Sequence, residues 1–249
     1  ERAVPRVTLR NSFAHPFDSA IAAARTCYAP RLISAEEINE KQRTNIGAAT
    51  FYSGHHTVFQ HAHYEFGLEN VSRQFVWSFL HAHPFYNSEQ QSQRYVRLDQ
   101  AVAYIPDMNN LYGAEEIFRR AVARAWDAYR QIGALLRSDA RNILADIWHV
   151  GPMSHAKRVD KVDKQADKRA IEVARYVLPV AAATTMVHTI SGIVLHRLWR
   201  MSAASDTPTE ARIVIGEMVA RAREVDPDFF DRFGSGSMEE LPEWLAPAG

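Results

Sequence analysis

The chain has 249 residues, of which 47% are hydrophobic, and its 29 basic side chains balance its 29 acidic ones. A chain of this size can bury a substantial core, and its neutrality argues against a general nucleic-acid or membrane surface. Cys27 is the single cysteine, which excludes an internal disulfide and fits a reducing compartment. No apolar run resembles a signal peptide or a membrane-spanning helix, so we expect a cytoplasmic protein.

The first part of the chain predicts helices separated by one strand. An alanine-rich helix is expected over Ser19–Tyr28, and the capping-box pattern that begins at Ser34 predicts the start of a second helix. Alternation and aromatic residues over Val58–Leu68 favour a strand. Apolar residues at helical spacing over Val71–Leu80 predict another helix, which Pro84 ends.

Longer helices are predicted in the second part. The longest covers Ala114–Arg137, with apolar residues three to four positions apart. The charged stretch Lys157–Arg169 favours a solvated helix face or loop over an anion site. Ala170–His188 is apolar and helical in pattern apart from Pro179, and Thr207 is predicted to cap a last helix that ends near Glu224.

Domain organisation is simple in the sequence. There is no convincing boundary between independent domains, no internal repeat and no low-complexity tract. Residues after Asp226 are rich in proline, glycine and serine. We therefore expect one domain over 1–249, with a flexible tail over about 226–249.

Residues 54–95 hold the most informative motif, GHHTVFQHAHYEFGLENVSRQFVWSFLHAHPFYNSEQQSQRY. This segment resembles the flavin-dependent thymidylate synthases, which carry Gly-His-x-Thr/Ser-x-Phe-Glu-His, then a helix that ends in Arg-His-Arg, and a serine seven residues later in Ser-x-Arg-Tyr. The frame is present from Gly54 to His61 and again in Gln91–Tyr95. The centre differs, because His81-Ala82-His83 stands where the family has Arg-His-Arg and one extra residue precedes Ser92. A register that keeps the seven-residue spacing places Ala82-His83-Pro84 there instead. Both family arginines are absent in either register.

A second region extends the resemblance over most of residues 20–220. Ala174–Pro179 with Thr184 is similar to the family's Ala-Arg-x-x-Leu-Pro…Thr segment, and Thr207–Arg212 falls where the family has Ala-Gln-x-Glu-Ile-Arg. The resemblance implies an α/β fold with a mixed sheet and long flanking helices. It also implies a homotetramer that binds FAD and dUMP where subunits meet, with methylenetetrahydrofolate as one-carbon donor and NADPH as reductant.

The resemblance also assigns a nucleotide site. Methylation of dUMP at C5 by hydride from a reduced flavin requires two planar rings to be oriented and a phosphate to be held, and arginine is the planar, bidentate donor that suits phosphate. Ser92, Arg94 and Arg175 are therefore expected to carry the reaction. The full set expected to bind the substrate is Ser78, Gln91, Ser92, Arg94, Arg175 and Arg200.

Cofactor contacts are implied for a second set, namely His55, Thr57, Gln60, His81, His83, Glu89 and Ser191. Several of these depart from the family. Gln60 replaces a glutamate, and Ser191-Gly192-Ile193 stands where the family has Asn-x-Arg, so an amide and a guanidinium are lost. His81 and His83 are either partial replacements for the missing arginines, cationic only when their pKa exceeds the ambient pH, or packing residues.

Three functions remain open from the sequence. The first is a divergent flavin-dependent thymidylate synthase that acts on dUMP or a related pyrimidine nucleotide. The second is a flavin- or nucleotide-binding paralogue without that activity, because the charged contacts are fewer. The third is a metal-dependent enzyme on the same scaffold, because His61 and His63 would share one face of a strand. No carboxylate or cysteine cluster joins these histidines, so we assign no metal ligands.

Overall fold

A computed structural model describes residues 1–83 and 86–233. It confirms the predicted mixed α/β fold. The contacts between Cα atoms divide the chain into two compact units. The first, here called the hairpin unit, contains Glu1–Val4, Ser72–Gln74 and Gln90–Thr184; the second, the sheet unit, contains the remaining described residues. The expectation of one domain remains a prediction, and each unit is described by itself.

The main sheet has four strands in the order β2-β3-β6-β4. Their bounds are β2 Arg6–Ser12, β3 His63–Ser72, β6 Ala183–Ser191 and β4 Tyr86–Gln90. Strands β2 and β3 pair antiparallel, with Val7 opposite Leu68 and a register shift between Leu9 and Asn11. Alternate residues of β3 are buried, which is the period expected of a strand with one face in the core.

Helices pack on this sheet and form a large apolar core. They are α1 Pro16–Thr26, α2 Glu40–Tyr52, α3 Arg73–His81, α6 Gly192–Met201, α7 Thr209–Val225 and α8 Asp228–Asp231, with the short 3-10 helices η1 Ala35–Glu37 and η2 His56–His61. The core includes Phe17, Phe59, Tyr64 and Phe66, none of which is exposed to solvent. Among the helices within the described ranges, none is both long enough and apolar enough to cross a membrane.

Gly192 begins α6 at a place where a side chain does not fit. A Cβ atom at this position would lie 2.7 Å from the Phe229 ring, while the Gly192 amide donates to the Ala62 carbonyl at 2.8 Å. Phe229, Phe230 and Phe233 are buried in the same core. The first residues of the expected tail are thus packed, because three aromatic rings join the core there; residues 234–249 lie outside the described ranges.

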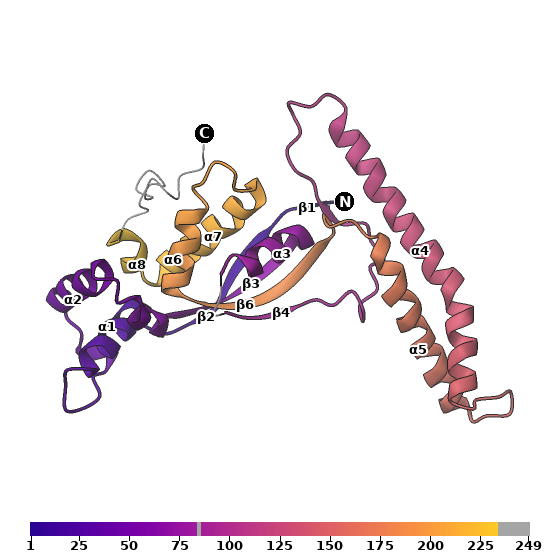
Figure 1. Ribbon diagram of the computed structural model, residues 1–249, viewed down its shortest axis with the longest axis horizontal. Helices are drawn as coiled ribbons and strands as arrows, with labels where there is room; N and C mark the ends of the chain where they lie inside the picture. Colours follow the sequence, from indigo (N-terminus) through magenta and orange to yellow (C-terminus); the bar gives the residue numbers. More distant parts are fainter. Residues whose placement is uncertain (84–85, 234–249) are drawn as a thin grey trace. The chain divides into compact units, whose positions relative to one another are not determined.

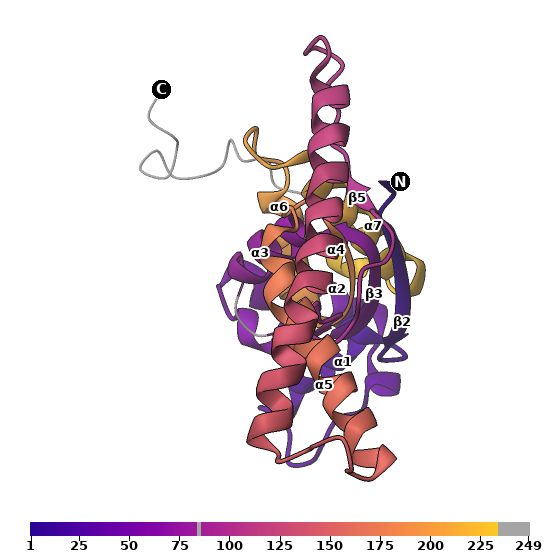
Figure 2. The same cartoon turned by 90° about the vertical axis from the view of Figure 1, so that its right-hand side faces the viewer.

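The hairpin unit is built on two antiparallel helices, α4 Ala114–Ile147 and α5 Ala156–Ala174 (Figures 1 and 2). Val122 and Trp126 of α4 pack with Ala103 and Ala182, and Tyr129 packs with Ile171 and Ala174 of α5. A short parallel pair, β1 Arg2–Ala3 and β5 Ala103–Tyr104, and the 3-10 helix η3 Arg175–Val177 complete the unit. Helix α4 extends well past its predicted end at Arg137.

Several predicted elements are wrong in kind or extent. Val58–Leu68 is not one strand, since His56–His61 forms η2 and β3 begins at His63. The predicted helix over Ala170–His188 ends with α5, and β6 follows, because burial from Ala183 onward alternates residue by residue.

Two predicted helix caps differ from the structure, whereas a predicted charged helix face agrees with it. The Ser34 capping box is present but begins only η1, and α2 starts later with Asn39, whose side chain accepts from the Gln42 amide. Thr207 does not cap α7; its hydroxyl donates to the Met201 carbonyl at 3.1 Å, and the helix begins at Thr209. The charged stretch Lys157–Arg169 lies within α5, as the solvated-helix interpretation predicts.

Candidate functional site

In the hairpin unit, the two family motifs meet around Glu172 near the end of α5. Arg94 Nε donates to Glu172 Oε1 at 2.6 Å, and Arg175 Nε donates to the Glu172 backbone carbonyl at 3.0 Å. The Ser92 hydroxyl accepts from the Arg94 backbone amide at 3.2 Å. The fold therefore brings Ser92, Arg94 and Arg175 into one group of contacts, although they come from separate parts of the sequence.

Glu172 controls the charge at this place. Hydrogen bonds from Arg94 and then Arg169 lower the pKa of its carboxyl group, so it is ionised at neutral pH. The Arg175 guanidinium lies 5.2 Å from the Tyr176 ring centre and makes no ion pair with a carboxylate within the described ranges. Of the three arginines, Arg175 is therefore the one whose charge no carboxylate within the described ranges neutralises. Sequence reasoning missed Glu172, and its position three residues before Arg175 on a helix is the only sequence signal for it.

Gln91, the remaining predicted residue of this unit, takes part through its backbone. Its carbonyl accepts from Arg73 Nη2 at 2.8 Å, and its side chain is exposed. Arg73 thus supports the segment that carries Ser92 and Arg94.

The sheet unit contains the predicted cofactor residues. His55 and Thr57 are exposed at the start of η2. The Ser191 hydroxyl, at the end of β6, donates to Gln60 Oε1. This bond orients the Gln60 amide so that its nitrogen, a donor, points away from Ser191. The two residues that replace the family's glutamate and asparagine therefore contact each other.

Two hydrogen bonds hold the ring of the neighbouring His56 in one orientation. Arg197 donates to His56 Nδ1 at 2.9 Å, so His56 Nε2 carries the proton that is donated to the Phe51 carbonyl, also at 2.9 Å. The His56 ring stacks on Phe51, with ring centres 4.9 Å apart. These contacts fix the start of η2 beside His55 and Thr57.

His81 and His83 differ sharply in environment. His81 is exposed at the end of α3, with its ring stacked on Trp77. His83 is buried, and its Nε2 lies 3.3 Å from Nε2 of His188, whose Nδ1 contacts Ser88 Oγ at 2.6 Å. Burial lowers the pKa of His83 and so disfavours its cationic form. The packing interpretation is the one that the structure supports for His83.

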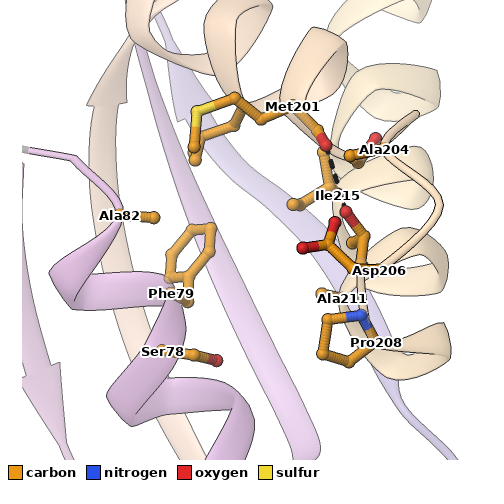
Figure 3. A pocket seen from close by; sticks show the side chains of 12 residues that line it. Ser78, Phe79, Ala82, Met201, Ala204, Asp206, Pro208, Ala211 and Ile215 are labelled. Carbon is orange, nitrogen blue, oxygen red and sulfur yellow. Dashed lines mark hydrogen bonds between the residues drawn. The ribbon is translucent and has the colours of Figure 1, made fainter. Parts of the chain in front are cut away.

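A pocket of about 270 Å³ lies between the end of α3 and the α6–α7 connection (Figure 3). Ser78, Phe79 and Ala82 form one side, and Met201, Pro208 and Ile215 are on the other. The Asp206 carboxylate points into the space. Most of the lining is apolar, and its charged side chain, Asp206, is negative, so the pocket does not suit a phosphate.

Three predicted residues of the sheet unit remain, and of these Ser78 lines the pocket. The Ser78 hydroxyl donates to the Phe75 carbonyl at 3.1 Å. Arg200 is half-buried on α6 but is not among the pocket residues, and Glu89 is exposed on β4. The predicted set is thus divided: Gln91, Ser92, Arg94 and Arg175 belong to the hairpin unit, and the rest to the sheet unit.

The predicted juxtaposition of His61 and His63 on one strand face is wrong, because His61 belongs to η2 and only His63 belongs to β3. In the part of the chain that the structure describes, no group of three histidine, cysteine, aspartate or glutamate residues could hold a metal ion. The metal-dependent alternative gains no support from the described geometry.

Comparison with known proteins connects these observations to a family. A family model described as thymidylate synthase complementing protein matches residues 8–228. The flavin-dependent thymidylate synthase of Nitratidesulfovibrio vulgaris is 31% identical over 94% of this chain and 89% of its own length. That of Clostridium tetani is 28% identical over 98% of this chain and 93% of its own.

Solved structures agree in fold. The UMP/dUMP methylase PolB from Streptomyces cacaoi, solved with 5-Br dUMP, aligns with a TM-score of 0.66 at 19% identity and covers 95% of this chain and 98% of that one. The same protein solved with 5-Br UMP aligns with a TM-score of 0.63 at 18% identity. At these identities the likeness concerns the fold alone.

Proposed function

The chain belongs to the thymidylate synthase complementing protein family of flavin-dependent thymidylate synthases, and we propose that it transfers a one-carbon unit reductively to C5 of dUMP or a related pyrimidine nucleotide. The observation that carries this proposal is that Arg94 and Arg175 both donate to Glu172, while the Ser92 hydroxyl accepts from the Arg94 backbone amide. These residues match the family in two separate motifs, and the fold brings them into one group. Two guanidinium groups and a serine hydroxyl are donors of the kind that suits a nucleotide phosphate.

The flavin assignment is supported by the donors of the sheet unit. His55 and Thr57 expose their side chains at the start of η2, and the Gln60 amide nitrogen is directed away from Ser191. These groups suit the acceptor oxygens and nitrogens of a flavin. When bound, the flavin would supply the hydride that reduces the transferred carbon. We propose FAD as the cofactor, methylenetetrahydrofolate as one-carbon donor and NADPH as reductant.

In this reaction the protein's own residues would bind and orient the nucleotide. Arg94 and Arg175 would hold the phosphate, and Ser92 would add one hydroxyl contact. Holding the nucleotide at a fixed distance from the hydride donor turns an encounter into a step within one complex, which accounts for much of the rate of such enzymes. Glu172 holds the Arg94 side chain by a hydrogen bond before the nucleotide arrives.

Assembly into a homotetramer is part of the proposal. Apolar side chains of α4 are unusually exposed, with relative exposures of 60% for Ile117, 75% for Leu135, 58% for Ile143 and 63% for Ile147. Such apolar residues on a long helix favour contact with another protein surface. A second copy of this chain would cover them and would bring further residues to the nucleotide and flavin sites.

A second candidate function is a nucleotide- or flavin-binding protein without turnover. It is favoured by one observation: His83, which stands at a family arginine when the motif is aligned on His81-Ala82-His83, is buried against His188 and has a lowered pKa. Burial thus disfavours the cationic form of this side chain. The nucleotide would then bind through the hairpin unit without the orientation that transfer requires.

The test is an assay of purified protein with dUMP, methylenetetrahydrofolate, NADPH and FAD, in which dTMP is measured by chromatography. Visible absorbance of the same sample reports bound flavin. Formation of dTMP supports the first function. Flavin absorbance and dUMP binding without dTMP indicate the second, and absence of both contradicts each of them. A variant with Arg175→Ala serves as the negative control for turnover.

A further inference from the structure

Lysine is almost confined to one helix of this protein. Lys157, Lys161, Lys164 and Lys168 all belong to α5, and Lys41 is the only lysine elsewhere in the sequence. The remaining basic residues are arginines. Spacings of four, three and four residues place the four lysines within about 60° of arc on one face of the helix, over a rise of about 17 Å. We call this set the lysine stripe.

The lysine stripe lies on the side of α5 that faces solvent within the hairpin unit. All four lysines are exposed. The opposite side of the helix is buried at Val162, Ala166 and Ala170, and α4 runs alongside α5 (Figure 2). A ligand can therefore reach the stripe within this unit without disturbing the packing of the two helices.

The acidic residues of α5 do not neutralise the stripe. Asp163 and Asp167 each accept a hydrogen bond from an arginine of α4. Asp160 pairs with Lys164 at 2.7 Å, but both side chains are exposed, so the pair contributes little. The other three lysines make no ion pair within the described ranges. Cations and carboxylates are thus separated on this helix, and the neutral total charge of the chain conceals a positive face.

An aromatic pocket adjoins the first lysines of the stripe. Trp148, which follows α4, lines a pocket of about 320 Å³ together with Val150, Arg158 and Lys161. Lys161 Nζ lies 5.2 Å from the centre of the Trp148 ring, and Arg158 Nη2 donates to the Trp148 carbonyl at 2.7 Å. A space of this size holds a small ring system. A base that stacks on the indole would bring its backbone phosphate close to two cations.

We propose that the lysine stripe and Trp148 bind single-stranded nucleic acid without regard to its sequence. This activity goes beyond the proposed function and does not depend on it. The ammonium groups contact successive backbone phosphates, and the Trp148 ring stacks on a base, which is the combination that such binding uses. Lysine suits a mobile strand because its point charge on a flexible stem adapts to each phosphate, whereas arginine favours fixed, bidentate geometry. An acidic polypeptide would match the charge alone.

The experiment follows the fluorescence anisotropy of a labelled single strand of about 15 thymidines as protein is added at several salt concentrations. We expect a dissociation constant of about 1–100 µM and a salt dependence of log K with a slope of about −2 to −3. Replacing all four lysines of the stripe by glutamine should weaken binding about 100-fold near 0.1 M salt and remove most of this slope, because three or four phosphate contacts are lost. No binding by the unaltered protein would overturn the proposal.

A matched control removes the same charge from α4. It replaces four exposed arginines by glutamine, namely Arg119, Arg120, Arg124 and Arg130. This variant and Lys41→Gln should bind the strand within about twofold of the unaltered protein, because charges more than about 10 Å away are screened near 0.1 M salt. An equal loss of affinity in both fourfold variants would show that total charge, and not the stripe, attracts the strand, and would overturn the proposal.

The contribution of Trp148 is tested separately. Trp148→Leu should weaken binding about 5- to 10-fold, whereas Trp148→Phe keeps a ring and should bind nearly as the unaltered protein does. Equal affinities of all three would overturn the stacking role. Polyglutamate at the same concentration of charges should displace the strand poorly; displacement as effective as that by unlabelled oligothymidine would identify a general polyanion surface and reject nucleic acid as the ligand.

Two further measurements separate folding and the proposed function from this result. If the fourfold lysine variant shows no cooperative thermal unfolding, the double variants at Lys157 with Lys161 and at Lys164 with Lys168 replace it. Each should lose about 10-fold in affinity, and unchanged affinity in both rejects the proposal. Titration with dUMP is run in parallel: a protein that binds the strand but not dUMP contradicts the proposed function alone, and the reverse result contradicts only the lysine stripe.

Discussion

The Nε2 atoms of His83 and His188 lie 3.3 Å apart in the interior of the sheet unit. His188 is completely buried, and Ser88 Oγ lies 2.6 Å from its Nδ1. A hydrogen bond between two imidazole nitrogens requires one of them to be unprotonated. The pair is therefore a buried polar contact with at least one neutral ring, and it connects β6 to the segment after α3.

We predict that this pair makes the protein less stable in acid. Burial, and then the charge of His83, lowers the pKa of His188 to about 3, whereas an unfolded histidine has a pKa of about 6.5. The unfolded chain binds more protons between these values, so stability is complete above pH of about 6.5 and falls as the pH decreases below it. The slope contributed by His188 approaches about 1.4 kcal/mol per pH unit.

Urea unfolding at pH 7, 6 and 5 measures this effect. His188→Gln should be less stable at pH 7 but should lose less stability between pH 7 and 5 than the unaltered protein. His61→Gln, an exposed histidine of η2, is the control and should keep the original slope. Equal slopes for the unaltered protein and His188→Gln would mean that His188 is not the group that titrates.

Gly192→Ala is predicted to destabilise the sheet unit. The added Cβ would lie 2.7 Å from the fully buried Phe229 ring, which cannot move away without displacing its own neighbours. Overpacking of this kind costs about 1–3 kcal/mol. Gly216→Ala is the matched control, because a Cβ at that position in α7 meets no atom within 4 Å and alanine favours a helix. Chemical denaturation should show a loss for the first variant and no loss for the second.

Arg94→Ala and Arg175→Ala are each predicted to weaken dUMP binding by about 1.5–3 kcal/mol, the usual range for hydrogen bonds to charged groups. Neither change should alter the fold much, since Arg94 is exposed and Arg175 bonds only to a backbone carbonyl within the described ranges. Calorimetric titration measures the affinity, and circular dichroism checks the fold. Unchanged dUMP and dTMP affinities in both variants would point to a different ligand for the hairpin unit.

The predicted homotetramer can be tested through α4. Leu135→Glu and Ile143→Glu place a charge on an exposed apolar side chain, at relative exposures of 75% and 58%, so they should not disturb the fold of one subunit. If a second copy covers this face, each variant should form smaller species in light scattering at micromolar concentration. Arg130→Glu on the same helix is exposed and polar, and it provides the control. A monomer of unaltered protein would contradict the prediction outright.

The sequence by itself determined the family, the mixed α/β fold and the helices with strong local patterns. Helices α1, α3, α4 and α7 were all expected near their observed positions, because their apolar spacing and turn residues act within a few positions of the chain. The motif residues Ser92, Arg94 and Arg175 were also recognisable in the sequence, although it could not show what they contact.

Only the tertiary structure decided which apolar runs became strands and which polar groups meet. The apolar pattern predicts a helix where β6 lies, because a short apolar run fits both a helix and a strand. The place of β6 in the sheet depends on partner strands far along the chain. Likewise Ser191 and Gln60 are 131 residues apart, so no local pattern predicts their bond. No local pattern predicts the burial of His83 against His188 either. The charge of a histidine depends on its solvation, and contacts between distant parts of the chain determine that solvation.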